Sequence, residues 1–324
     1  PRTGLEVGPQ TGDPQGFKTI EELKEAVRKQ FEYAVQMNVV VNNTIEHAYI
    51  MFHPTPFHNL MHPSSRRTGL DLNMGPCKYN YFGAIGTGLG TAADCMAAIG
   101  QLVFEERICS MNELLAALKA DWVGFESLRE KCINAPKYGT DNDIADYWAK
   151  FIADVFMDCY EQHPTIRGGK YLCGFFSVTQ NHVLGEDTDA TPDGRKAGEM
   201  LSDSTAPSPY AKALGPTATH RSATKAIDTL RTVNGITFAQ NMDLSVLLSE
   251  RELSKWANLI RTFISDGGQS VQYNVVSAEQ LKEAQKFPGK YKDLFVRIGG
   301  YTARFVELNR NMQDAIINKS VQRC

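Results

Sequence analysis

Two adjacent glycines, Gly299 and Gly300, lie in the segment of this chain that offers the most distinctive chemistry. They end an apolar run from Phe295 to Ile298, and Tyr301 follows them. As local structure, this pattern predicts a strand, a glycine turn that uses a positive φ and a second short strand. As chemistry, a peptide glycine can lose an α-hydrogen and leave a planar carbon radical that the flanking amides delocalise. Because oxygen and water destroy such a radical, the second interpretation predicts that Gly300 lies on a buried loop.

The segment from Arg297 to Leu308, RIGGYTARFVEL, resembles the fingerprint of the glycyl radical enzymes related to pyruvate formate-lyase. In that fingerprint an Arg stands three residues before the radical Gly, an aromatic residue follows the Gly, and a Phe comes a few residues later. The matching residues are Arg297, Gly300, Tyr301 and Phe305, whereas Ile298 stands where the family commonly has Val. The resemblance implies that Gly300 stores the radical in a loop formed with Arg297, Gly299, Tyr301 and Phe305.

Other segments resemble the same family, in the family's order. They are GPQTGDP from Gly8, KYN from Lys78 with the glycine-rich run to Gly90, TPDGRKAG from Thr191, GPTA from Gly215 and VQYN from Val271. The family's second radical residue is a Cys in a Cys-x-Glu loop, and none of the seven Cys stands in such a loop; Cys77, nearest to a glycine-rich turn, has Tyr79 two residues later. The chain also begins without Met, in a turn-rich segment. We therefore expect the C-terminal part of a longer enzyme, with the catalytic Cys in a missing N-terminal portion or a separate chain.

The resemblance implies an α/β fold, part of a ten-stranded β/α barrel of the glycyl radical type. Residues 1–200 would form the C-terminal half of the barrel domain, and residues 201–324 the glycyl radical domain. A radical S-adenosylmethionine activating enzyme would install the radical. The glycyl radical would then convert the Cys to a thiyl, which takes hydrogen from a small organic substrate. No bound metal or cofactor is expected for turnover, and a cytoplasmic, anaerobic homodimer is expected.

The substrate is poorly determined by the sequence. The segment PRTGLEVGPQTGDP is closest to aryl-acetate decarboxylases and fumarate-adding synthases. His182 is a candidate proton donor in the pocket or a loop histidine, and Arg195 either binds a substrate carboxylate or stabilises the turn after Pro192. Gln272 and Asn274 share one face of a predicted strand and could point into the cavity.

Two alternative functions stay open. A non-catalytic chain could carry the radical glycine and complement a damaged partner. A nicotinamide-dependent oxidoreductase could use the run Gly86 to Gly90, although its spacing is GxGxG and not GxGxxG, so close backbone packing is the simpler interpretation. His58 and His62 have helical i, i+4 spacing, but with Pro54 and Pro56 beside His53 the three histidines fit loop packing better than a metal site.

The elements that must position these residues alternate between helices and strands, which favours an α/β layout. Capping patterns predict helices after Thr19, Ser110 and Ser249, and after Asp141 or Asp143. Alternation or apolar runs predict strands at 236–242, 271–275 and 295–298. The stretch from about Gly185 to Ala218 has no regular pattern, and such long loops in compact domains are often functional.

The composition is that of a globular protein, with 42% hydrophobic and 22% charged residues and a net charge of -3. This balance offers no electrostatic basis for binding nucleic acid or an anionic membrane. The absence of a long apolar run argues against a transmembrane helix. The odd number of widely spaced Cys, without CxxC, argues against a disulfide framework or structural zinc.

Overall fold

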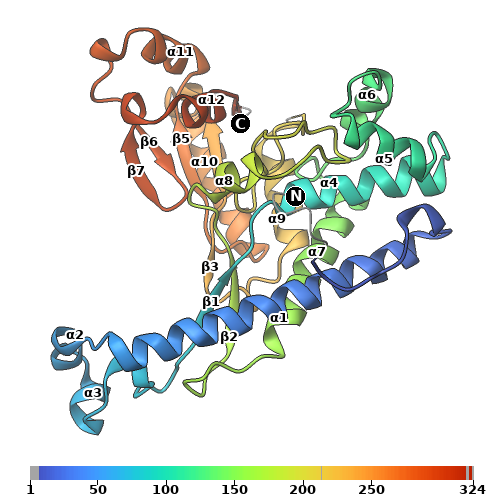
Figure 1. Cartoon of the computed structure of the whole chain (residues 1–324). Helices are drawn as coiled ribbons and strands as arrows, with labels where there is room; N and C mark the ends of the chain where they lie inside the picture. Colours follow the sequence, from blue (N-terminus) through green and yellow to red (C-terminus); the bar gives the residue numbers. More distant parts are fainter. Residues whose placement is uncertain (1–6, 213, 319–320, 323–324) are drawn as a thin grey trace. The chain divides into compact units, whose positions relative to one another are not determined.

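The chain was analysed as a computed structural model that describes residues 7–212, 214–318 and 321–322 (Figure 1). It divides into two compact units. One comprises Pro1–Ala84 and Val155–Cys173, and the other Ile85–Asp154 and Gly174–Cys324. The two are described separately below.

Helices and short strands alternate along the chain. The helices are α1 (Ile20–Phe52), α2 (Pro56–Met61), α3 (Pro63–Thr68), α4 (Leu89–Ile99), α5 (Met111–Lys119), α6 (Glu126–Asn134), α7 (Asp143–Glu161), α8 (Gln180–Glu186), α9 (Pro216–Ala226), α10 (Glu250–Ser265), α11 (Ala278–Lys286) and α12 (Arg310–Asn318). The strands are β1 (Phe82–Ile85), β2 (Tyr171–Phe175), β3 (Gly235–Ile236), β4 (Ala239–Met242), β5 (Gln272–Val275), β6 (Phe295–Ile298), β7 (Tyr301–Arg304) and β8 (Val321–Gln322). The predicted α/β class is confirmed. Among the described residues, no helix has both the length and the apolar character needed to cross a bilayer.

Helix starts follow the predicted caps in three cases. Thr19 begins α1 with a complete capping box, and Ser110 and Ser249 each accept a hydrogen bond from the backbone N–H three residues later. The prediction for α7 was wrong in its residue. Asn142, and not Asp141 or Asp143, accepts the N–H groups of the first turn, from Ile144 at 3.0 Å and from Ala145 at 3.3 Å.

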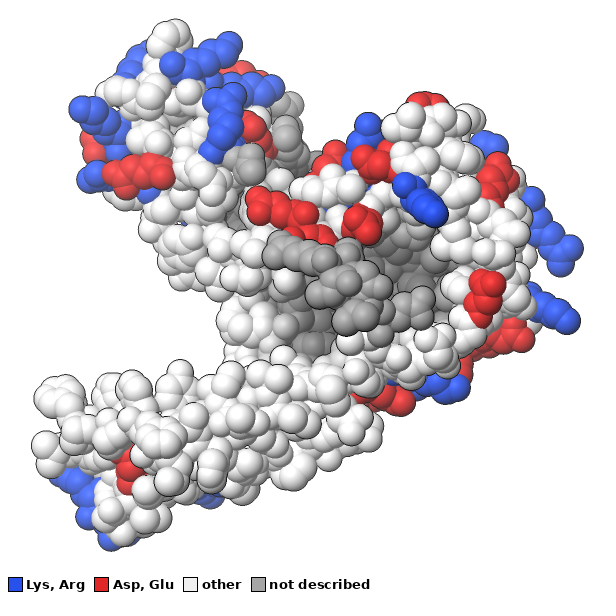
Figure 2. Space-filling view, in the orientation of Figure 1, with Lys and Arg blue, Asp and Glu red and all other residues white. Residues whose placement is uncertain are grey.

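The first unit is organised around the long helix α1. Two side chains of α1 accept hydrogen bonds from tyrosines of the same unit. The Tyr160 hydroxyl donates to Asn38 at 2.9 Å, and the Tyr171 hydroxyl donates to Asn43 at 2.8 Å. Another side exposes apolar residues, and Figure 2 shows that the face in view along α1 carries few charges. The exposed apolar residues of α1 are Met37, Val40, Val41, Ile45, Tyr49, Met51 and Phe52.

The described strands form three small sheets. The first has the order β1-β2-β3, with β2 and β3 parallel, and the second has the order β5-β4-β8, with both pairs parallel. The third is the antiparallel hairpin of β6 and β7. The single strand predicted at 236–242 is two strands in different sheets. The chain changes sheet at Thr237, whose N–H donates to the carbonyl of Phe175 at 2.9 Å.

A small apolar core in the second unit holds the β6–β7 hairpin. It contains Val276, Leu281, Ala284, Val296 and Phe305, and Phe305 is completely buried. In Figure 1 the hairpin lies beside α11 and α12, which carry residues packed on this core. Phe305 therefore anchors the end of the hairpin that is opposite to its turn.

The glycine-rich run from Gly86 to Gly90 joins β1 to α4. Gly88 caps α4 in the left-handed conformation, with φ 84°. A Cβ on Gly90 would lie 3.0 Å from the carbonyl oxygen of Ala206 and 3.2 Å from the nitrogen of Ser208. These contacts support the packing interpretation of this run over a dinucleotide site.

Candidate functional site

The turn of the β6–β7 hairpin consists of the two glycines. Ile298 pairs with Tyr301, so Gly299 and Gly300 are the only residues between the strands. Gly300 has φ 98°, a conformation that strains any L-residue, whereas nothing lies within 4 Å of the position that its Cβ would occupy. Gly299 is favoured for a different reason, because its Cβ would make a tight contact, 3.3 Å from the backbone nitrogen and Cα of Val178.

Val178 itself has an unusual backbone conformation. Its φ is 56°, which is a genuine outlier for a β-branched residue. Strained backbone of this kind clusters at functional sites. The segment that contacts the glycine turn is therefore strained at the point of contact. The sequence offers no signal of this, since Val178 lies 121 residues from Gly299 along the chain (299 − 178).

Side chains of β5 hold the hairpin. Asn274 accepts a hydrogen bond from the N–H of Arg297 at 2.6 Å and donates one to its carbonyl at 3.0 Å. The carboxamide oxygen of Gln272 accepts from the N–H of Gly300 and from Nε of Arg297, both at 3.2 Å. Arg297 also donates from Nη1 to the Thr302 hydroxyl at 3.2 Å. Gln272 and Asn274 thus lie on one face, as predicted, and that face is directed at the glycine hairpin.

The expectation that Gly300 is buried is wrong for the part of the chain that the structure describes. Gly300 is exposed, and Tyr301 beside it is 39% exposed. The physical reason is that the described residues leave one side of Gly300 open, since none lies within 4 Å of its Cβ position, whereas Gly299 is buried against the backbone of Val178.

A cavity of about 520 Å³ lies within the second unit, beside the turn end of the hairpin, where Arg297 and Ile298 line it. Its lining includes two of the predicted pocket residues, His182 and Asn274, and also Arg297 of the radical loop. Burial lowers the pKa of His182, so its imidazole is neutral at pH 7. Gln272 is not in this lining; it lies with Asn274 and Arg297 in a shallower depression along β5 and β6.

Sequence reasoning missed most of the cavity. The missed lining residues include Asp203, Tyr210, Lys212, Gln240 and Asn241. Three of them lie in the long irregular stretch that its length marked as a functional candidate. The length of an irregular stretch predicts that the segment is functional, but it does not predict which of its side chains line a cavity.

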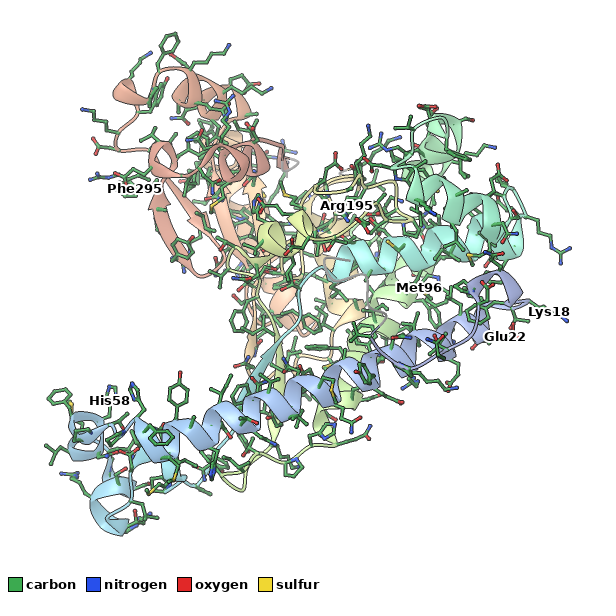
Figure 3. All side chains as sticks on the ribbon, viewed as in Figure 1. Lys18, Glu22, His58, Met96, Arg195 and Phe295 are labelled. Atoms are coloured by element: carbon green, nitrogen blue, oxygen red, sulfur yellow. The ribbon has the colours of Figure 1, made fainter. Side chains whose placement is uncertain are left out.

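Arg195 has a structural role and does not line the cavity. It is 1% exposed, and its guanidinium donates to the carbonyls of Lys196 at 2.9 Å and Glu199 at 2.6 Å. It also donates to the carbonyls of Thr188 and Asp189 and to the hydroxyl of Thr191. Figure 3 labels Arg195 within the loops of the second unit. Of the two roles left open by the sequence, the contacts support stabilisation of the loop.

None of the described cysteines lines the cavity. Cys159 has a Glu two residues later, but it lies within the helix α7, is buried, and has its pKa raised by burial. Burial likewise raises the pKa of Cys95, Cys109 and Cys132. These thiols are protonated at neutral pH and fit the role of small apolar residues.

Comparisons with known proteins agree with the hairpin geometry. The profile of the pyruvate formate lyase-like family matches residues 1–185, and the glycine radical profile matches residues 201–306, which include Gly300. A trans-4-hydroxy-L-proline dehydratase of Clostridioides difficile is 34% identical over 323 residues, 99% of this chain and 41% of its own length. A (2S)-3-sulfopropanediol dehydratase of Klebsiella oxytoca is 34% identical over 325 residues, 98% of this chain and 39% of its own length.

Solved structures give the same result. The glycerol-bound B12-independent glycerol dehydratase of Clostridium butyricum superposes with a TM-score of 0.96 at 33% identity, over 99% of this chain and 41% of that one. This likeness confirms the predicted fold of the glycyl radical enzyme type. The chain spans about two fifths of the length of these relatives. The chain belongs to the pyruvate formate lyase-like family of glycyl radical enzymes.

Proposed function

We propose that this chain supplies the radical glycine, Gly300, to a glycyl radical enzyme. The observation that carries the proposal is the hairpin turn at Gly299 and Gly300, which lies within the matched glycine radical domain and has Gln272 on the Gly300 N–H. Loss of one α-hydrogen from Gly300 to an activating enzyme of the radical S-adenosylmethionine type would leave a planar radical. Arg297, Gly299, Tyr301 and Phe305 would shape the loop around it.

The partner thiol would come from polypeptide outside this chain. The relatives are more than twice as long as the matched region, so a preceding portion or a separate chain has room for a Cys loop. The same polypeptide would cover Gly300 and exclude oxygen from it. This explains in one step why the turn is exposed here and why no described Cys faces the cavity.

The reaction that the relatives favour is the removal of water from a small hydroxylated substrate. The thiyl would take a hydrogen atom from a carbon that bears a hydroxyl. The bond between the neighbouring carbon and its own hydroxyl would then break, and that hydroxyl would leave as water with the proton of the first hydroxyl. The product radical would recover the hydrogen atom from the thiol. Two dehydratases at 34% identity support this class. Aryl-acetate decarboxylation stays secondary, because the decarboxylase relative, a 4-hydroxyphenylacetate decarboxylase glycyl radical subunit of Clostridioides difficile, is only 28% identical. Addition to fumarate rests on the linker sequence alone. We also propose a domain boundary near residue 200, and a homodimer in an anaerobic cytoplasm.

Asn274 and His182 line the cavity, and we propose that they act on the substrate side of the radical glycine. Asn274 holds the backbone of Arg297, and His182 offers a neutral imidazole in the cavity lining. A neutral imidazole can accept the proton of the hydroxyl on the radical carbon and, once protonated, pass it to the departing hydroxyl.

Oxygen-dependent cleavage tests the proposal. The protein would be activated without oxygen and then exposed to air, and the fragments would be weighed by mass spectrometry. Breakage at Gly300 is expected, and Gly300→Ala should abolish it. Gly289→Ala is the matched control, because it is exposed, has nothing within 4 Å of its Cβ position and leaves the hairpin turn unchanged. Intact wild-type chain after full activation and air exposure, or breakage that persists in Gly300→Ala, would refute the proposal.

A non-catalytic complementing chain would give the same cleavage. To distinguish a complementing chain from part of a complete enzyme, the protein would be mixed with a partner enzyme that has lost its own radical domain. Recovery of the partner's activity on mixing would favour complementation. Turnover that depends on a Cys loop in the same polypeptide as Gly300 would favour the complete enzyme.

A further inference from the structure

The β6–β7 hairpin is attached to β5 by side chains and not by a backbone ladder. β5 pairs with β4, while β6 and β7 pair only with each other among the described strands. The link is made by two amide side chains, Gln272 and Asn274, which stand two residues apart and so project from the same face of β5. Asn274 replaces a strand partner for Arg297, since it binds both backbone groups of that residue.

Gln272 is directed at the radical position itself. Its carboxamide oxygen receives two hydrogen bonds, one from the Gly300 N–H and one from Nε of Arg297. Both groups can only donate, so the oxygen, and not the nitrogen, must face them. Arg297 therefore fixes the orientation of the carboxamide that reaches Gly300. The backbone N–H of Gln272 is itself bonded to the carbonyl of Phe238 at 2.8 Å, which holds this residue in the sheet.

We infer that Gln272 is a positioning residue for the glycyl radical, an inference that rests on the proposed function. The unpaired electron on the Gly300 α-carbon would spread onto the flanking amide nitrogen. An acceptor on that N–H keeps the amide plane in one orientation and raises the electron density of the nitrogen, which favours delocalisation. Gln272 thus sets the geometry of the residue that stores the radical without touching the substrate.

The test compares Gln272→Met, which removes the acceptor, with Gln272→Glu, which keeps an acceptor oxygen. Gln280→Met on α11 is the matched control. In the complete activated enzyme, Gln272→Met should show an altered electron paramagnetic resonance splitting. The amount of radical per chain should fall roughly fivefold, because the loss of one net hydrogen bond changes an equilibrium by about that factor. Gln272→Glu should restore both, and Gln280→Met should match the wild type.

A second readout needs no activation. Hydrogen exchange of the peptide that contains Gly300 should be roughly fivefold faster in Gln272→Met, because the N–H loses its acceptor. Unchanged exchange, or a wild-type signal in Gln272→Met, overturns the inference while the proposed function stands. A defect of equal size in Gln272→Met and Gln272→Glu also overturns it. A wild-type protein without any radical signal would instead refute the proposed function.

Discussion

Replacement of Arg195 by Ala should destabilise the loop from residue 187 to 200. The guanidinium donates five hydrogen bonds, four of them to backbone carbonyls, and the residue is 1% exposed. At about 1.5 kcal/mol for each bond to a charged group, the sum would be about 7.5 kcal/mol. Because the loop can relax and water can enter, we expect a loss of about 3–5 kcal/mol in the free energy of unfolding, as for other broken buried networks.

Urea unfolding and hydrogen exchange of the loop peptides would measure this effect. Arg195→Lys keeps the charge but has three donors in place of five, so about 2–3 kcal/mol should be lost. Arg251→Ala, at an exposed position on α10, should change stability by less than about 0.5 kcal/mol. If Arg195→Ala is as stable as Arg251→Ala but raises KM, then Arg195 binds substrate and the structural argument is refuted.

Three further predictions concern other buried groups. Burial raises the pKa of Asp94 from 3.8 to about 7, so the folded protein holds a proton that the unfolded chain has lost in this range. The free energy of unfolding should therefore fall as the pH rises from 3.8 to about 7. Asp94→Asn should remove this slope, up to about 1.4 kcal/mol per pH unit in urea titrations, and an unchanged slope would contradict the assignment. Burial lowers the pKa of His220 to about 4 from 6.5, so the advantage of the wild type over His220→Asn should shrink as the pH falls through that range. Phe305→Ala should cost about 3–5 kcal/mol, whereas Phe295→Ala, on β6 in Figure 3 and 52% exposed, should cost less than about 1 kcal/mol; equal losses would show that Phe305 is not a core anchor.

Local signals in the sequence were sufficient for several elements. The caps at Thr19, Ser110 and Ser249 involve residues only three positions apart, so their partners can be read directly from the sequence. The glycine hairpin is local in the same sense, because its strands are adjacent. Asn142 was missed because two flanking Asp residues compete for the same capping position in the sequence.

Other features depend on segments that are far apart in the chain. The contact of Gly299 with the strained Val178 has no local signature, and neither does the change of sheet at Thr237. The exposure of Gly300 could not be predicted from the loop, since burial depends on what covers it. For Arg195 the sequence left two roles open, and only the surrounding carbonyls of the folded loop distinguish them.

Low-temperature electron paramagnetic resonance of the anaerobically activated protein tests the central claim most directly. A doublet is expected, from coupling of the unpaired electron to the one α-hydrogen that Gly300 retains. In protein labelled with glycine deuterated at the α-carbon the doublet should collapse, and in Gly300→Ala it should be absent. A doublet that persists in Gly300→Ala, or no signal from fully activated protein with oxygen excluded, would contradict the account.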